Sequence, residues 1–271
     1  MQSSRVINFG LIAVLTMSLI GCAPMAITGS ADVDKSVFGP SKRFAVVSIA
    51  AIKTFQGEKG LFQMFKDDKN IPGSNTQPMI NRLAPRIIKS LNHSHYISLL
   101  PERKVFKSRA YRHIQGDKRV ATALFFKYDM NVARHYKYIS DPKKLAQLAK
   151  QLNVDGVITV NVTFALTASK GSVSVAGLTL GKKSYSAMAS VSALAYDKTG
   201  KLIWKDSTTK EAEPGDSKAI ILIDTSDMTG TNFKKLQPSA IEIGGKAVDV
   251  LVGRFNDTME GKQASFMQSM K

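Results

Sequence analysis

The chain has 271 residues, a formal net charge of +17 and an apolar content of 44%. This apolar content, with only nine prolines, excludes general disorder. A single cysteine, Cys22, excludes a framework of disulfide bonds within the chain.

The first 21 residues have the order of a secretory signal. Their only charged residue, Arg5, precedes an apolar stretch over residues 9–20, which the small residue Gly21 follows. This stretch is shorter than the roughly 20 apolar residues that a helix needs to cross a bilayer. It runs into the string Leu-Ile-Gly-Cys, which ends at Cys22 and resembles the lipobox of bacterial lipoproteins.

This resemblance implies cleavage between Gly21 and Cys22 and acylation of Cys22, so that the lipid bilayer is the first expected partner. Two acyl chains are enough for stable anchoring. By the same analogy, Ala23 in place of an aspartate favours the outer membrane, on its periplasmic side. The alternative for Cys22 is a buried or incidental thiol.

Loss of Arg5 with the signal leaves 250 residues with a charge of +16. Strong basic charge is typical of nucleic-acid-binding proteins, but an exported lipoprotein rarely meets nucleic acid, and we expect no such partner. The polyanions within its reach are lipid headgroups, lipopolysaccharide phosphates and peptidoglycan carboxylates. The alternative is that the charge serves solubility alone.

The expected domain organisation is simple. A signal peptide covers residues 1–21, and a flexible tether follows over residues 22–41, where Pro, Gly, Ser and Asp occur with little periodicity. A single periplasmic domain covers residues 42–260, and residues 261–271 form an irregular tail.

The sequence of the first half of the domain predicts two strands and a helix. Residues 43–50 are a compact apolar, β-branched run and predict a buried strand. Residues 53–73 mix aromatic, glycine and charged positions, which indicates an inserted loop or a short amphipathic helix. Apolar spacing predicts a helix over residues 77–91 with Thr76 as its N-cap, and a short strand over residues 96–100.

Residues 102–137 are strongly basic, and their apolar positions indicate helical pieces around a turn at Gly116 and Asp117. The candidate residues for binding an anionic polymer or an acidic partner lie at its start: Arg103, Lys104, Lys107, Arg109 and Arg112. The alternative is a solvated helix face without a partner.

The second half predicts a helix–strand junction and a long hairpin. Asp141 caps a helix that begins with Pro142, and Asn153 ends it in the left-handed conformation. The later elements are expected in this order: a strand over 154–166, a hairpin tip over 172–183, a strand over 184–196, a turn over 197–200, a strand over 201–206, an irregular stretch over 225–237 and a helix over about 246–255.

No constellation of catalytic residues is found. His93 and His95 would share a face and hold a metal if they lay on a strand; the alternative is that they are loop residues at a helix end. There is no His-Glu-x-x-His pair, no Gly-x-Ser-x-Gly elbow and no phosphate-binding glycine loop. We therefore predict a protein that is not an enzyme, with no catalytic residue, no cofactor and no metal.

The pattern over residues 145–158, a helix that leads through Asp155-Gly156 into a strand, resembles periplasmic lipoproteins of the curli-secretion-channel type. Outer-membrane lipoprotein activators of penicillin-binding proteins, and the amino-terminal domain of the Tol translocation protein, are similar. The resemblance implies an α+β (mixed α/β) fold, a twisted sheet with antiparallel hairpin strands and helices packed on one side. It also implies that the protein acts by binding.

These observations favour a membrane-anchored periplasmic lipoprotein that binds or scaffolds an envelope machine, through an envelope protein or an anionic wall polymer. One alternative is an oligomeric subunit of an outer-membrane secretion channel. A less favoured alternative is a cell-wall hydrolase. The sequence leaves the partner and the oligomeric state open.

Overall fold

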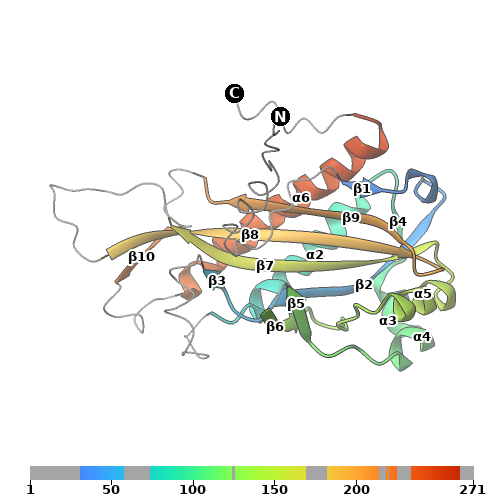
Figure 1. Ribbon diagram of the computed structural model, residues 1–271, viewed down its shortest axis with the longest axis horizontal. Coiled ribbons are helices and arrows are strands. Elements are labelled where there is room, and N and C mark those ends of the chain that lie inside the picture. Colours follow the sequence, from blue (N-terminus) through green and yellow to red (C-terminus); the bar gives the residue numbers. More distant parts are fainter. Residues whose placement is uncertain are drawn as a thin grey trace, which may run out of the picture.

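A twisted mixed β-sheet lies at the centre of the computed structural model (Figure 1). The structure describes residues 31–57, 74–123, 126–168, 182–213, 218, 220–224 and 233–262. The strands are β1 (Asp32–Val33), β2 (Arg43–Ile52), β3 (Gln56–Gly57), β4 (Ser98–Leu99), β5 (Val120–Ala123), β6 (Phe126–Val132), β7 (Gly156–Ala168), β8 (Lys182–Asp197), β9 (Leu202–Glu211) and β10 (Ile220–Asp224). The helices are α2 (Gln77–Asn92), α3 (Glu102–Lys107), α4 (Arg109–His113), α5 (Pro142–Gln151) and α6 (Gln237–Met259), with short 3-10 turns η1 (Lys35–Val37) and η4 (Phe233–Lys235).

The sheet combines an antiparallel meander with a parallel crossover. Its strand order is β1-β9-β8-β7-β2-β6-β5, and β10, β3 and β4 pair with β8, β7 and β2. Strands β7, β8 and β9 are antiparallel, whereas β2 runs parallel to β7 and antiparallel to β6. Parallel neighbours need a long connection, which here contains α2 to α5. The predicted α+β class with antiparallel hairpin strands is confirmed.

Helices cover both faces of the sheet, so the expectation that they pack on one side is wrong. On β2, Phe44 and Val46 point into a large core with α2 and α6, while Ala45 and Val47 point into a smaller core with α3, α4 and α5. A strand buried on both faces needs a covering layer on each. The apolar run of β2, which has no polar alternation, is the sequence signal for the second layer.

Helix α6 is longer than predicted and begins at Gln237 rather than near residue 246. Glycine lowers helix propensity. Gly244 and Gly245 directly precede the predicted start of the helix, so the sequence predicted a start that was too late. Both glycines lie where α6 crosses α2. A Cβ atom on Gly244 would lie 3.0 Å from Leu83 Cδ2, and the Arg86 guanidinium occupies the space beside Gly245. Close helix packing therefore outweighs the propensity cost.

A buried ion pair fixes α6 against β9. Arg254 Nη2 lies 3.0 Å from Asp206 Oδ1, and Nη1 donates to the carbonyl oxygen of Ser207 at 3.2 Å. Burial raises the pKa of Asp206, and the charge of Arg254 opposes this rise. The ring centroids of Trp204 and Phe255 are 4.7 Å apart beside the pair. These contacts set the position of α6 along the strand.

The predicted tether over residues 22–41 is wrong for residues 31–41, which belong to the folded domain. Strand β1 pairs with β9, with Val33 opposite Trp204. Phe38 is buried, stacked on Phe44 at 4.8 Å and packed edge-on against Phe255 at 5.0 Å. The segment lacks periodicity because its strand and turn are short. Phe38 holds it against the core.

The helical pieces predicted for the basic segment are confirmed only up to His113. Beyond it, β5 and β6 form an antiparallel hairpin, and β6 pairs with β2 through Val132 opposite Ala50. The hairpin forms because the edge of β2 offers unpaired backbone groups, which a sequence pattern does not reveal.

Local signals around α2 and α5 were mostly correct. Asp141 Oδ1 accepts from the backbone N–H of Lys143 at 2.9 Å, and Asn153 has a left-handed φ of 51°. Thr76 occupies the N-cap position of α2 but makes no cap hydrogen bond. Its hydroxyl donates to the carbonyl of Ile52 at 2.6 Å, which ties the helix to β2.

Several predictions fall outside the described residues. They concern the signal and Cys22, most of residues 53–73, the hairpin tip up to residue 181, most of residues 225–237 and most of the tail. In the part of the chain that the structure describes, no helix has the length and apolar character needed to cross a membrane.

The crossing of α2 and α6 makes a prediction about stability. Gly244→Val places branched carbons against Leu83, so we expect the free energy of unfolding to fall by about 2 kcal/mol. Gly253, in the same helix, has no atom within 4 Å of a Cβ position. Gly253→Ala should therefore raise stability by up to about 1 kcal/mol. Urea unfolding of both variants checks this, and equal effects would contradict it.

Candidate functional site

The predicted cations lie together on helices α3 and α4, where all five are exposed: Arg103, Lys104, Lys107, Arg109 and Arg112. We call them the α3–α4 basic surface. The same helices bury Val105 and Tyr111 in the smaller core, so the charged side chains face outward. Among the described residues, none of the five takes part in an ion pair.

A buried tyrosine and a partly buried lysine fix the position of α4. The Tyr111 hydroxyl donates to the carbonyl of Val47 on β2 at 2.9 Å and accepts from the backbone N–H of Lys137 at 2.8 Å. Burial raises the pKa of Tyr111, so the phenol keeps its proton. Lys137 Nζ donates to the carbonyls of Arg112 and Ile114 at 2.9 and 2.7 Å. This ammonium group thus occupies the carboxyl end of α4.

Asp117 joins the loop that follows α4 to the start of α5. Its carboxylate accepts from Lys144 Nζ at 2.5 Å and from the backbone N–H groups of Ser140 and Asp141 at 2.7 and 3.0 Å. Burial alone would raise the pKa of Asp117, but these hydrogen bonds outweigh burial and lower the pKa to about 2. The carboxylate therefore holds the two helices in a fixed arrangement at neutral pH.

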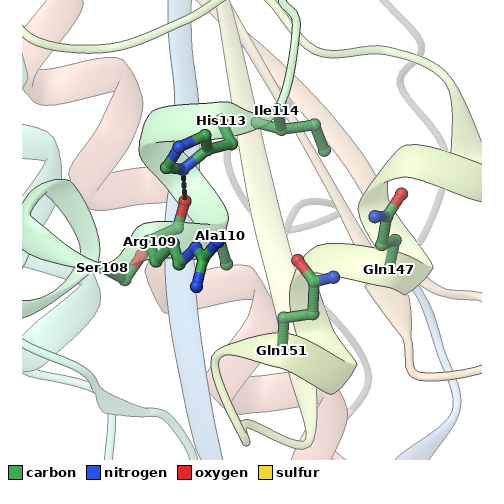
Figure 2. Close-up of a pocket in the computed structure, with 7 residues that line it drawn as sticks. All are labelled: Ser108, Arg109, Ala110, His113, Ile114, Gln147 and Gln151. Carbon is green, nitrogen blue, oxygen red and sulfur yellow. Dashed lines mark hydrogen bonds between the residues drawn. The ribbon is translucent and has the colours of Figure 1, made fainter.

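A groove of about 590 Å³ lies between α4 and α5 (Figure 2). Its lining residues are Ser108, Arg109, Ala110, His113, Ile114, Gln147 and Gln151. In Figure 2 the arginine and the histidine project from α4, and the two glutamines project from α5 on the other side of the groove. The groove thus combines a cation, an imidazole, two amides and a small apolar surface.

Some polar groups of the groove are engaged in local structure. The Ser108 hydroxyl caps α4 by accepting from the N–H of Tyr111 at 3.1 Å, and it donates to the carbonyl of Val105. His113 Nδ1 lies 2.8 Å from the carbonyl oxygen of Arg109. A carbonyl can only accept, so Nδ1 carries the hydrogen, and in the neutral form of the imidazole Nε2 is then an acceptor.

The remaining polar side chains of the groove are exposed: Arg109, Gln147 and Gln151. The nearby carboxylates are already engaged, because Asp117 binds Lys144 and Glu102 accepts from the Tyr136 hydroxyl at 2.6 Å. The arrangement suits binding of an anionic group. It does not place a nucleophile beside a base.

Sequence reasoning found part of this site. It identified Arg109 as a binding candidate but not the groove, nor the roles of His113, Gln147 and Gln151. The spacing of the two glutamines was a usable signal, since residues four apart on a helix lie on one face. That the two glutamines face α4 across the groove depends on tertiary structure.

The predicted metal candidates do not form a site. His93 is the C-cap of α2 and His95 lies in the following turn, so both are at a helix end and not on a strand. Within the described ranges, no group of three or more His, Cys, Asp or Glu residues is placed to hold a metal ion. Cys22 lies outside these ranges.

No protein-family model and no curated protein matches the sequence. Among solved structures, the chain is similar to the LpoB C-terminal domain from Salmonella enterica, with 7% identity and a TM-score of 0.33, over 63% of this chain and 83% of that one. It is also similar to a putative neuraminyllactose-binding hemagglutinin homolog from Helicobacter pylori, with 10% identity and a TM-score of 0.30, over 85% of this chain and 88% of that one. Similarity at this level carries no argument about function.

The Asp117 link predicts a pH-dependent stability. A pKa lowered from 3.8 to about 2 corresponds to about 2 kcal/mol of stability, which is complete above the unfolded pKa and is lost as pH falls through about 2. Asp117→Asn should therefore lower the free energy of unfolding by about this amount at pH 7, and by progressively less below pH 4.

Urea unfolding of the wild type and Asp117→Asn at pH 7 and pH 3 measures this difference. Asp129→Asn serves as the control, because Asp129 is exposed and its 3.8 Å contact with Lys53 is at the surface. A loss of stability in Asp117→Asn that is the same at both pH values would contradict the assignment.

Proposed function

We propose that this chain is a non-enzymatic lipoprotein, anchored through acylated Cys22 on the periplasmic side of the outer membrane, that acts as a binding or scaffolding factor for an envelope machine. The observation that carries the proposal is the α3–α4 basic surface. Its exposed cations rest on a rigid buried support and are not neutralised by carboxylates in the described part of the chain. Such a surface is suited to an acidic partner.

The anchor limits how far the domain reaches. Cys22 precedes Ala31, the first described residue, by nine positions. Nine residues span at most about 32 Å when fully extended. An acylated Cys22 would therefore keep the near end of the domain within this distance of the membrane. A partner must therefore come within reach of a domain whose first described residue is held near the membrane.

The partner class follows from charge and location. An envelope protein with an acidic surface, or an anionic wall polymer, would complement the α3–α4 basic surface. The basic surface and the core are separate parts of α3 and α4, so binding would require no rearrangement of the core.

The secretion-channel alternative has less support from the described strands. The apolar residues of β7 that a lipid-facing strand would expose, including Val160, Val162 and Phe164, are buried in the large core with α2 and α6. The hydrolase alternative would need an activated nucleophile or a pair of carboxylates in the groove. The Ser108 hydroxyl donates to the carbonyl of Val105 instead of to a base, and no carboxylate is among the lining residues.

The anchor is tested by mass spectrometry of the protein from outer-membrane fractions. We expect an amino terminus at Cys22 that carries acyl chains, and release from the membrane only by detergent. Cys22→Ser should abolish acylation and membrane attachment while the domain still folds. An unmodified, uncleaved amino terminus in the wild type would refute the proposed anchoring.

The basic surface is tested by charge reversal. Arg103→Glu with Lys104→Glu should weaken binding to isolated cell envelopes about tenfold or more at low salt, and the difference should shrink as salt rises. The matched control is Arg82→Glu with Lys89→Glu, which changes the same charge at exposed positions of α2. Co-sedimentation measures both pairs. Equal weakening in the two pairs would mean that net charge alone determines envelope binding. No weakening in the α3–α4 pair would mean that the α3–α4 basic surface is a solvated face without a partner.

A further inference from the structure

The groove between α4 and α5 has the features of a preorganised binding site. Its α4 wall is fixed by Tyr111 on β2 and by Lys137 at the helix end. Its α5 wall is fixed by Asp117 through Lys144. Binding groups on a rigid support lose little conformational entropy when a ligand arrives. The lining side chains without a structural role are then available for recognition.

The two glutamines provide a repeat that matches an extended peptide. Gln147 and Gln151 are four residues apart on α5, which corresponds to about 6 Å along the helix axis. Alternate residues of an extended chain are about 6.7 Å apart. A glutamine amide can donate to a backbone carbonyl and accept from a backbone N–H. The pair can therefore bind two successive peptide groups that face the same way.

The opposite wall provides a site for a carboxylate. The Arg109 guanidinium presents several N–H donors in a plane, the geometry that binds a carboxylate through two parallel hydrogen bonds. In its neutral form, His113 has Nε2 as a further acceptor for a backbone N–H of the ligand. Ala110 and Ile114 are partly buried between these groups and can contact the aliphatic part of an acidic side chain.

We propose that the groove between α4 and α5 binds a short extended peptide segment of a partner protein, with an Asp or Glu side chain on Arg109 and peptide groups on Gln147 and Gln151. This inference rests on the proposed function and specifies its partner. A lipid phosphate would need only point charges, and it would give the paired amides no role. The lining also contains no Trp, Tyr or Phe for a sugar ring to contact.

The test uses the full chain in detergent micelles and a fluorescein-labelled eight-residue peptide in which aspartate alternates with serine. A second peptide has asparagine in place of aspartate. Fluorescence anisotropy should show saturable binding of the aspartate peptide, and binding of the asparagine peptide should be about tenfold weaker or undetectable, because it cannot form the charged hydrogen bonds to Arg109.

Three variants separate specific recognition from general attraction. Gln147→Ala with Gln151→Ala changes no charge, yet it should weaken binding about tenfold without altering the salt dependence. Arg109→Ala should weaken binding by about tenfold or more and reduce the salt dependence. Lys143→Ala removes the same charge from an exposed position of α5 outside the groove, and it should leave affinity within about twofold.

Unchanged binding in the double glutamine variant, with normal thermal unfolding, would overturn the proposal, because it would mean nonspecific attraction. Equal binding of the asparagine peptide would overturn it as well. No binding of the aspartate peptide, together with direct binding of soluble peptidoglycan fragments or phosphatidylglycerol vesicles, would overturn the proposal and reassign the groove to wall or lipid. The proposed function is tested separately by Cys22 acylation and envelope binding, so its failure is distinguishable from failure of the groove.

Discussion

Strand β2 is buried along both of its faces, and most of the architecture follows from the need to cover it. One face of β2 lies under α2 and α6, and the other lies under α3, α4 and α5. The first layer gives the sheet its main core. The second layer is smaller and is placed near one end of the sheet, where its helices expose the basic surface and the groove (Figure 1).

The second layer depends on polar groups that are satisfied within it. Tyr111, Lys137 and the Asp117–Lys144 pair use their hydrogen bonds to hold α4 and α5 in place. Lys137 and Lys144 therefore belong to the structure, although the sequence places them among many other cations. Arg109 and its neighbours on α3 and α4 have no such role in the described part of the chain, which separates the cations of the proposed binding surface from the structural ones within a single basic segment.

Local physical rules predicted the elements that are stabilised locally. The Asp141 cap, the left-handed Asn153 and the apolar run of β2 were identified correctly, because each depends on residues close together in the chain. The start of α6 was missed because its glycines are favourable only when α2 packs against them. The hairpin of β5 and β6 was missed because it forms by pairing with the edge of β2.

The sequence by itself determined the signal and lipobox pattern and the concentration of cations after residue 102, and its resemblance to periplasmic lipoproteins implied the α+β class. The pattern and the concentration of cations are written in composition and order. Only the tertiary structure decided that residues 31–41 join the core, that helices cover both faces of the sheet, and that Arg109 lies across a groove from Gln147 and Gln151. The physical reason is that these arrangements depend on contacts between distant segments, whose free energy appears only when the chain is packed.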